Sequence, residues 1–194
     1  CPTGGWGAID AALKTMKVVA LGILALVAVA YWPAGQAFFV KDDIALFASA
    51  NLDVSEALFR SWPGGFFRPI AEWFYAIQHR LFGFTSLPYH LVSLVAHLAA
   101  ACCVYHLCRL WSERRIGLIA AALFALHPLN TESVSWISGQ MSLISGLCGL
   151  TVLCLAVRGG SVLGIAAVFV LGQGFYENFP IVLLLWAGWR TCYL

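Results

Sequence analysis

The sequence predicts an all-α membrane protein: a polytopic bundle of about six transmembrane helices with one amphipathic helix on the membrane surface. The first observation is composition, since 61% of the residues are hydrophobic and only 10% are charged. Soluble domains are about 45–50% apolar and about 25% charged. The second is a series of apolar runs, several near the roughly 20 residues that cross a bilayer core. The third is that, if successive runs cross the bilayer in alternating directions, the cations near their ends all lie on one side of the membrane.

Six apolar runs are expected to cross the bilayer. In chain order they are Met16 to Val40, Leu87 to Trp111, Ile116 to Leu126, Glu132 to Val157, Val162 to Phe175 and Ile181 to Trp189. The first is longer than the apolar part of a signal peptide and holds Tyr31 and Trp32, which are typical of a membrane interface. The third is short and requires a locally thinner bilayer. We expect residues 1–194 to form one transmembrane domain and to be a fragment of a longer protein.

Residues 41–86 differ from the rest and form the expected first outer loop. They hold five of the nine acidic residues. From Phe67 to Leu81, apolar residues recur at helical spacing with Glu72, Gln78 and Arg80 between them. This pattern is typical of an amphipathic helix that lies along the membrane surface.

The positive charges orient the bundle. If the six runs alternate, the lysines and arginines near their ends share one side, and the positive-inside rule makes that side cytoplasmic. These cations are Lys14, Lys17, Arg109, Arg114, Arg115, Arg158 and Arg190. The other side then carries the acidic loop, the turn from His127 to Glu132 and the segment around Glu177. Because acidic groups are costly near hydrocarbon unless they face water, a partner or a site, we expect the functional site there.

Two polar groups on the outer side have a chemical and a structural interpretation. Asp42 and Asp43 directly follow the first run, where adjacent carboxylates can act as a general base, hold a divalent cation, or form a solvated helix end. Arg68 precedes Pro69 at the start of the surface helix, where it can grip a phosphate or anchor the helix at the interface. The residues alone leave these alternatives open.

Two histidine-containing segments also lie toward the outer side. In the turn from His127 to Glu132, Pro128 ends one helix, and Asn130 or Thr131 can cap the next. Capping leaves the position of His127 unexplained. His90, Ser93 and His97 share one helical stripe, for which interhelical hydrogen bonding is the favoured interpretation, since no third ligand for a metal is evident. The net charge of +2 and the lack of a basic arm exclude a nucleic-acid-binding protein.

Several short motifs occur in an order that resembles one known family. They are Phe39 to Asp43, Ala50 to Val54, Phe67 to Pro69, Leu81 to Gly83, Tyr89 to Ser93 with His97, Phe124 to Pro128, and Thr131 to Gln140. This series resembles the membrane part of the tetratricopeptide-repeat O-mannosyltransferases and their bacterial relatives. These proteins belong with the protein O-mannosyltransferases in the GT-C glycosyltransferase superfamily. The resemblance extends over most of the chain, and the His-Pro-x-x-Thr-Glu segment and the Asp-Asp pair are its most specific parts.

The resemblance implies a polyprenyl-phosphate monosaccharide as donor and an inverting transfer to an acceptor hydroxyl of a protein or glycan. It implies a multi-pass protein of the bacterial inner membrane or the endoplasmic reticulum, in contact with membrane lipid and active on the periplasmic or lumenal face. The family's catalytic base corresponds to Asp42 first and Asp43 second. The implied substrate-binding residues are Arg68, His127, Glu132 and Glu177. No cofactor besides the lipid-linked donor is expected, and a divalent cation, although compatible with the carboxylates, is not predicted.

The chain departs from the family pattern at three positions. Tyr176 stands where the family has Lys before Glu, Asn130 where His is common, and Gln140 where Arg is common. Either another cation compensates for these losses, or this member is divergent or inactive.

Two other functions compete with a glycosyltransferase. A transporter or flippase of a lipid-linked or small polar substrate predicts internal repeats and polar residues at mid-membrane. A non-catalytic membrane scaffold predicts no pocket around Asp42 and Asp43. The glycosyltransferase requires the aspartate pair and the His127–Pro128 bend on the same side of the membrane.

Overall fold

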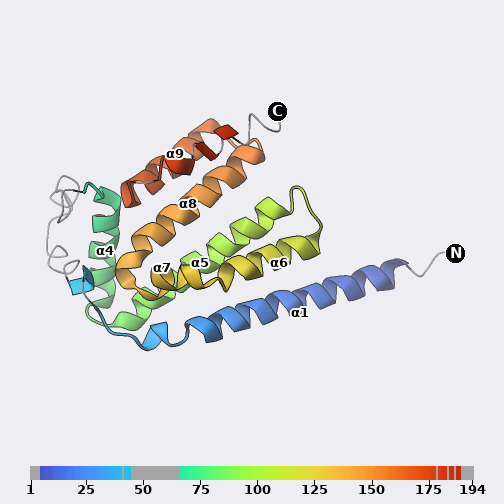
Figure 1. The fold of residues 1–194 in the computed structure, drawn as a ribbon, viewed down its shortest axis with the longest axis horizontal. Coiled ribbons are helices and arrows are strands. Elements are labelled where there is room, and N and C mark those ends of the chain that lie inside the picture. Colours follow the sequence, from blue (N-terminus) through green and yellow to red (C-terminus); the bar gives the residue numbers. More distant parts are fainter. Residues whose placement is uncertain are drawn as a thin grey trace.

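The fold is a bundle of antiparallel helices whose long axes run in nearly the same direction, with one helix lying across their ends (Figure 1). The computed structural model describes residues 5–40, 42–44, 66–177, 179–182, 184–185 and 187–188. The described helices, all α or 3-10, are α1 (Gly5–Tyr31), η1 (Ala34–Gln36), α4 (Pro69–Phe82), α5 (Ser86–Cys108), α6 (Arg114–Ala125), η2 (Pro128–Asn130), α7 (Thr131–Ser135), η3 (Ile137–Gly139), α8 (Gln140–Val157) and α9 (Val162–Phe175). The described residues include no β-strand, and the all-α class is confirmed.

In the part of the chain that the structure describes, two helical segments are long and apolar enough to cross a membrane, namely Ser86–Cys108 and Ile137–Val157. Val18–Tyr31 and Val162–Phe175 are apolar but shorter, and α6 has only 12 residues. The expected count of six spans therefore stays a prediction. The sixth expected span, Ile181 to Trp189, is described only in part, and the Ala50 to Val54 motif lies outside the described residues.

The first apolar run contains a helix end that hydropathy did not predict. The run extends to Val40, but α1 ends at Tyr31, and Ala37 after η1 is extended. Pro33 explains the end, because it lacks an N–H and its ring conflicts with the carbonyl of Val29 if the helix continues. The short 3-10 turn η1 then leads the chain toward the aspartate pair.

The fourth expected span, Glu132 to Val157, is broken near its start. Trp136 is extended, with φ −95° and ψ 125°, and separates α7 from η3 and α8. Gly139 allows η3 to fold closely onto α7, because a Cβ on Gly139 would lie 3.0 Å from the carbonyl oxygen of Glu132. The break leaves the backbone N–H of Ser138 available to a partner outside the helix.

Helix α4 packs its polar side against the bundle. Glu72 and Gln78 are buried together with Tyr75, whereas Trp73 and Leu81 are exposed. An apolar outward face suits lipid, and inward polar groups then find hydrogen-bond partners in the protein. The helix predicted between Phe67 and Leu81 is present as Pro69–Phe82, with proline in its first turn.

The end of α6 is fixed by two side chains that replace missing helical bonds. Pro128 cannot donate to the carbonyl of Phe124, and Asn130 Nδ2 donates to it instead at 2.6 Å. His97 Nε2 of α5 lies 2.9 Å from the carbonyl oxygen of Ala125. Asn130 therefore closes the preceding helix and makes no capping bond to α7, which corrects its expected role. The interhelical role expected for His97 is confirmed.

A buried amide holds α4, α5 and α8 together. Gln140 is fully buried, and its Nε2 donates to the carbonyl oxygen of Tyr89 at 2.7 Å and to Ser93 Oγ at 2.9 Å. Its Oε1 accepts from Gln78 Nε2 at 3.0 Å. Ser93 thus takes the interhelical role expected for it. Gln140, which stands where Arg is common in the family that the sequence resembles, thus joins three helices through an uncharged amide.

We expect Gln140→Leu to destabilise the protein by about 1–3 kcal/mol, because the substitution leaves Gln78 and Ser93 without their buried partner. The measurement is the thermal unfolding midpoint of the full-length protein in detergent. Ser142→Ala, at an exposed position of the same helix, is the matched control and should leave the midpoint unchanged. An equal midpoint for Gln140→Leu and the control would contradict the role of the amide.

Candidate functional site

The outer polar residues gather at one end of the bundle. The end of α1, helix α4, helix α7 and the end of α9 meet there, whereas the α5–α6 and α8–α9 turns lie at the opposite end (Figure 1). Those turns carry Arg109, Arg114 and Arg158. The His127–Pro128 bend follows the end of α6, which lies beside the middle of α5, where His97 Nε2 is 2.9 Å from the carbonyl oxygen of Ala125. The expectation that the bend and the aspartate pair share one side of the membrane therefore stays a prediction.

Asp43 joins the segment after α1 to the break before α8. Its Oδ1 accepts from the backbone N of Ser138 at 2.8 Å and from Ser138 Oγ at 2.5 Å. Its Oδ2 accepts from the backbone N of Val40 at 3.0 Å. The carboxylate is only 1% exposed, and hydrogen bonds from three donors offset the cost of burying a charge. Two segments that are 95 residues apart in sequence are thereby joined.

The neighbouring Asp42 has the opposite environment. It is exposed, although it directly precedes the buried Asp43 in the same short helical segment. The two carboxylates therefore differ in role: one is occupied by internal hydrogen bonds, and the other faces outward. The sequence alone did not distinguish them.

A pocket of about 360 Å³ opens next to Asp43. Its polar lining includes His90 of α5 together with Thr131, Glu132 and Ser135 of α7, and its apolar lining includes Phe38 and Trp136. The structure thus brings Asp43 and Glu132 to one cavity. A pocket at this place is not what the scaffold alternative predicts.

Arg68 forms a second polar centre with Glu177. Its Nε donates to Oε2 of Glu177 at 2.6 Å and its Nη2 donates to Oε1 at 2.5 Å. The guanidinium lies over the rings of Phe66 and Tyr176, at 4.8 Å and 4.4 Å from their centroids. Tyr176, which replaces the family's Lys, therefore contributes a cation–π contact to Arg68.

The ion pair changes the acidity of both partners. The hydrogen bond from Arg68 lowers the pKa of Glu177 below its ordinary value of 4.5, and the same bond raises the pKa of Arg68. The guanidinium fork is held in the planar, two-point arrangement that also suits a phosphate. Glu177 occupies that fork in this structure.

Tyr75 connects α4 to the Asp43 anchor and was missed by the sequence analysis. Its hydroxyl donates to the carbonyl oxygens of Ile137 and Ser138, at 2.9 Å and 3.2 Å. Burial, with a smaller contribution from the charge of Asp43, raises the pKa of the Tyr75 hydroxyl well above its ordinary value. A usable signal was its spacing from Arg68 and Glu72, which places all three on one helical face.

His127 does not join the pocket. It is exposed, and its Nδ1 accepts a hydrogen bond from the backbone N of Leu129 at 3.2 Å. This bond caps the short turn η2, so the structure gives His127 a local role. Among the described residues, no group of three or more His, Cys, Asp or Glu side chains is arranged to hold a metal ion.

Comparisons with known proteins identify relatives of this chain. Residues 63–194 match the family model described as dolichyl-phosphate-mannose-protein mannosyltransferase. The mouse protein O-mannosyl-transferase TMTC3 is 29% identical over 139 residues, which cover 64% of this chain and 15% of the relative. The Drosophila melanogaster protein O-mannosyl-transferase Tmtc1 is 37% identical over 87 residues, which cover 44% of this chain and 10% of the relative. The chain thus spans only a small part of these relatives, and no solved structure matches it.

We expect Ser138→Ala to loosen the Asp43 anchor, because the carboxylate loses one of its three donors. A hydrogen bond to a charged group contributes about 1.5–3 kcal/mol, so amide exchange at Val40 should accelerate by about tenfold or more. Hydrogen–deuterium exchange of the full-length protein measures this rate. Ser135→Ala, in the same pocket, is the control, and Ser138→Thr should restore protection. Equal exchange in Ser138→Ala and wild type would contradict the anchor.

We expect the contribution of Glu177 to stability to be pH-dependent. Because folding lowers its pKa, the ion pair with Arg68 stabilises the protein above the ordinary value of 4.5 and this contribution is lost as pH falls through the lowered pKa. The difference in unfolding midpoint between wild type and Glu177→Gln should therefore shrink toward acid. Thermal unfolding between about pH 3 and pH 6 measures it. A difference that stays constant over this range would contradict the pairing.

Proposed function

This chain belongs to the dolichyl-phosphate-mannose-protein mannosyltransferase family, and we propose that it forms part of a glycosyltransferase that moves mannose from a polyprenyl phosphate to a hydroxyl of a protein. The acceptor class follows the printed names of the relatives, which are protein O-mannosyl-transferases. The observation that carries the proposal is the difference in burial between the two adjacent aspartates, since Asp42 is exposed and Asp43 is buried.

Asp42 is the proposed general base. A base needs a carboxylate oxygen that a substrate hydroxyl can reach, and Asp42 is exposed. Asp43 is buried and accepts hydrogen bonds from three donors. Two like groups in contrasting environments commonly take different catalytic tasks. Asp43 therefore positions the segment that carries the base.

The proposed reaction is a single displacement. The acceptor oxygen attacks the anomeric carbon of mannose on the face opposite the phosphate, and its proton passes to Asp42. The bond between the anomeric carbon and the phosphate oxygen breaks, and its electron pair leaves with the phosphate. This geometry inverts the anomeric configuration, and a phosphate stabilised by a cation needs no proton to leave.

Arg68 is the proposed phosphate contact. Its guanidinium is oriented by two aromatic rings and holds a carboxylate at two points, as it would hold a phosphate. Binding of the donor phosphate then requires that Glu177 release at least one of its two hydrogen bonds with the Arg68 guanidinium. Glu132 lines the pocket near Asp43, where it can accept hydrogen bonds from sugar or acceptor hydroxyls.

The proposed location is a membrane that the chain crosses several times, with the reaction on its lumenal or periplasmic face. The support is the end-to-end charge asymmetry, since the arginines of the α5–α6 and α8–α9 turns lie opposite the acidic site (Figure 1). The positive-inside rule makes the arginine end cytoplasmic.

We expect Asp42→Asn to lower transfer by about 10²- to 10⁴-fold, which is the usual contribution of a general base. The assay follows transfer of radiolabelled mannose from dolichyl-phosphate mannose to protein by the full-length enzyme. The thermal midpoint and the amide protection of Val40 should stay as in wild type. Asp43→Asn is the comparison variant and should reduce both protection and transfer.

Full transfer by Asp42→Asn would remove Asp42 as the base. Wild-type protein that folds and binds the donor but transfers no mannose would remove the enzymatic function and favour a scaffold or a lipid transporter.

A further inference from the structure

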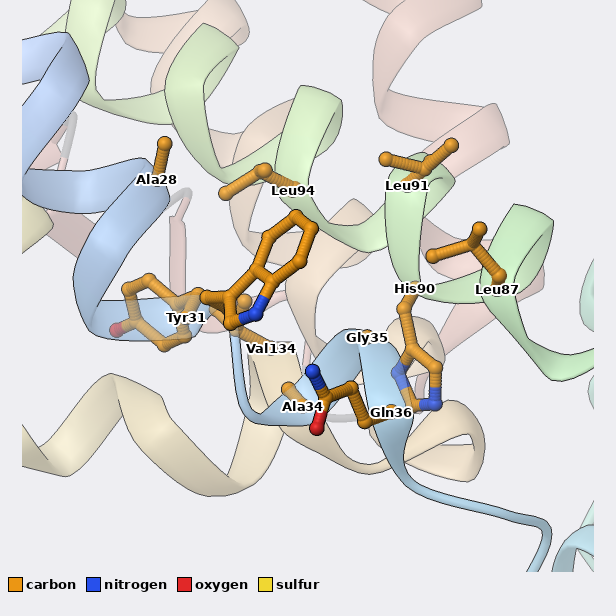
Figure 2. Close-up of a pocket in the computed structure, with 11 residues that line it drawn as sticks. Ala28, Tyr31, Ala34, Gly35, Gln36, Leu87, His90, Leu91, Leu94 and Val134 are labelled. Atoms are coloured by element: carbon orange, nitrogen blue, oxygen red, sulfur yellow. The ribbon is translucent and has the colours of Figure 1, made fainter.

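Two apolar grooves lie along the side of the bundle where α1 meets α5. The first has a volume of about 390 Å³ and lies beside the Asp43 pocket, between the end of α1, η1 and helix α5 (Figure 2). It shares His90 with that pocket, and its described lining includes no Asp, Glu, Lys or Arg. The second has a volume of about 500 Å³ and lies between α1, α5 and α6, and we call it the α6 groove. Of these two grooves, the α6 groove has a charged residue in its lining, namely Arg114.

The α6 groove is formed by one face of each of three helices. Helix α6 contributes Arg114, Leu118, Ala121 and Ala125, which recur at intervals of three or four residues and therefore share one face. Several lining side chains are small, such as Ala101 of α5, and they leave space between the helices. Because the walls are mainly apolar, they offer few hydrogen-bond partners, so the groove suits a hydrocarbon chain and not an extended peptide.

The depth of the groove corresponds to one leaflet of a bilayer. Helix α6 rises by about 16 Å from Arg114 to Ala125, and half of a hydrocarbon core is about 15 Å thick. The carbonyl oxygen of Ala125 lies 2.9 Å from His97 Nε2, beside the middle of α5. The groove therefore extends from the arginine end to the middle of the bundle. This depth suits the acyl chain of a lipid in one leaflet better than a helix that crosses both.

Arg114 provides a cation where the groove reaches the α5–α6 turn. It is the first residue of α6 and is partly buried. The ion pair that joins described side chains is that of Arg68 and Glu177, so no carboxylate among the described residues neutralises Arg114. A guanidinium presents planar donors that bind a phosphate at two points. An anionic group is therefore the partner that this position accommodates.

A second arginine lies close to the same end of the groove. Gly117 allows α5 and α6 to approach closely there, because a Cβ on Gly117 would lie 3.0 Å from Arg109 Cγ and 3.1 Å from Tyr105 Cδ2. The Arg109 guanidinium lies 6.0 Å from the centroid of the Tyr105 ring, and Tyr105 lines the groove. Glu113 is exposed and is the single acidic residue in the sequence from Arg109 to Arg115. The turn therefore has an excess of positive charge beside an apolar groove.

We propose that the α6 groove binds one acyl chain of an anionic phospholipid and that Arg114 binds the phosphate of its head group. In the proposed orientation this end of the bundle faces the cytoplasm, where the membrane leaflet carries anionic lipids. Basic pockets between transmembrane helices on that side commonly bind such head groups. The inference goes beyond the proposed function, because this lipid is not a substrate and its head group lies at the opposite end from helix α4 and the aspartate pair (Figure 1).

The first experiment fills the groove from α1. Ala20→Trp places an indole in it, whereas Leu21→Trp is the matched control because Leu21 is 65% exposed and does not line the groove. The full-length protein in detergent is titrated with dioleoylphosphatidylserine, and native mass spectrometry measures the bound lipid. We expect Ala20→Trp to weaken the tightest binding by at least about tenfold and Leu21→Trp to leave it unchanged. The thermal unfolding midpoint without added lipid should be equal in the two variants.

The second experiment tests the charge by comparison with dioleoylphosphatidylcholine, which has the same chains and a head group without net charge. We expect wild type to prefer the serine lipid by about tenfold or more, and Arg114→Gln to lower this preference by about fivefold or more. Arg158→Gln is the control, because Arg158 is exposed at the same end and does not line the groove. Glycerophosphoserine, which has the head group but no acyl chains, should not displace the bound lipid.

The third experiment identifies the occupant in the cell. Cys102 is exposed and lines the groove, so p-benzoylphenylalanine at this position can be crosslinked to whatever fills it. We expect an adduct with the mass of an anionic phospholipid. An adduct with a polypeptide or with a polyprenyl lipid would overturn the proposal.

Three further results would overturn the lipid site. They are unchanged binding by Ala20→Trp, equal affinity of wild type for the two phospholipids, and an equal loss of preference in Arg114→Gln and Arg158→Gln. Displacement by glycerophosphoserine would show a site for the head group alone and would also overturn the role of the groove. Lipid binding is measured without mannose transfer, so a protein that binds the serine lipid but transfers no mannose keeps this site and loses the proposed function.

Discussion

The buried carboxylate of Asp43 is the constraint on which the arrangement of the site depends. It receives three hydrogen bonds, two of them from Ser138, so the segment after α1 can lie in only one place relative to α8. Tyr75 binds the carbonyl side of the same turn and adds α4 to the assembly. An anion buried to this extent is tolerated only while its donors stay in position. The segment after α1, helix α4 and the break before α8 are therefore coupled through Asp43 and Tyr75.

Local chemistry allowed much of the fold to be predicted. The composition and apolar runs predicted helices, Pro128 predicted the bend after α6, and the phase of Ser93 and His97 predicted their contacts with neighbouring helices. The break at Trp136 was not predictable, because no proline marks it and its cause is the packing of η3 against α7 around Gly139. The inward polar face of α4 was missed for a similar reason. A pattern shows that a helix is amphipathic, but the surroundings decide which face is buried.

The residues of the candidate site could also be predicted from the sequence, whereas their contacts could not. The motif order selected Asp42, Asp43, Arg68, His127, Glu132 and Glu177. The structure brings Asp43 and Glu132 to one pocket and pairs Arg68 with Glu177, whereas Asp42 and His127 are exposed and do not line that pocket. Their partners could not be predicted, since the Arg68–Glu177 pair joins residues 109 positions apart. The substitution at Tyr176 is informative here. In place of a second cation it provides an aromatic ring under Arg68, which keeps the guanidinium oriented without adding charge.

Helix α5 explains why the polar and apolar cavities lie side by side. Successive turns of one face carry His90, Ser93 and His97, which contact the segment after η1, the start of α8 and the end of α6. These bonds join three neighbouring segments to α5. The neighbouring face carries Leu87, Leu91 and Leu94, which line the groove toward α1 (Figure 2). An α-helix places residues three and four apart on the same face, so the histidine and serine stripe and the leucine stripe run side by side along α5. His90 lines both cavities and therefore occupies that boundary.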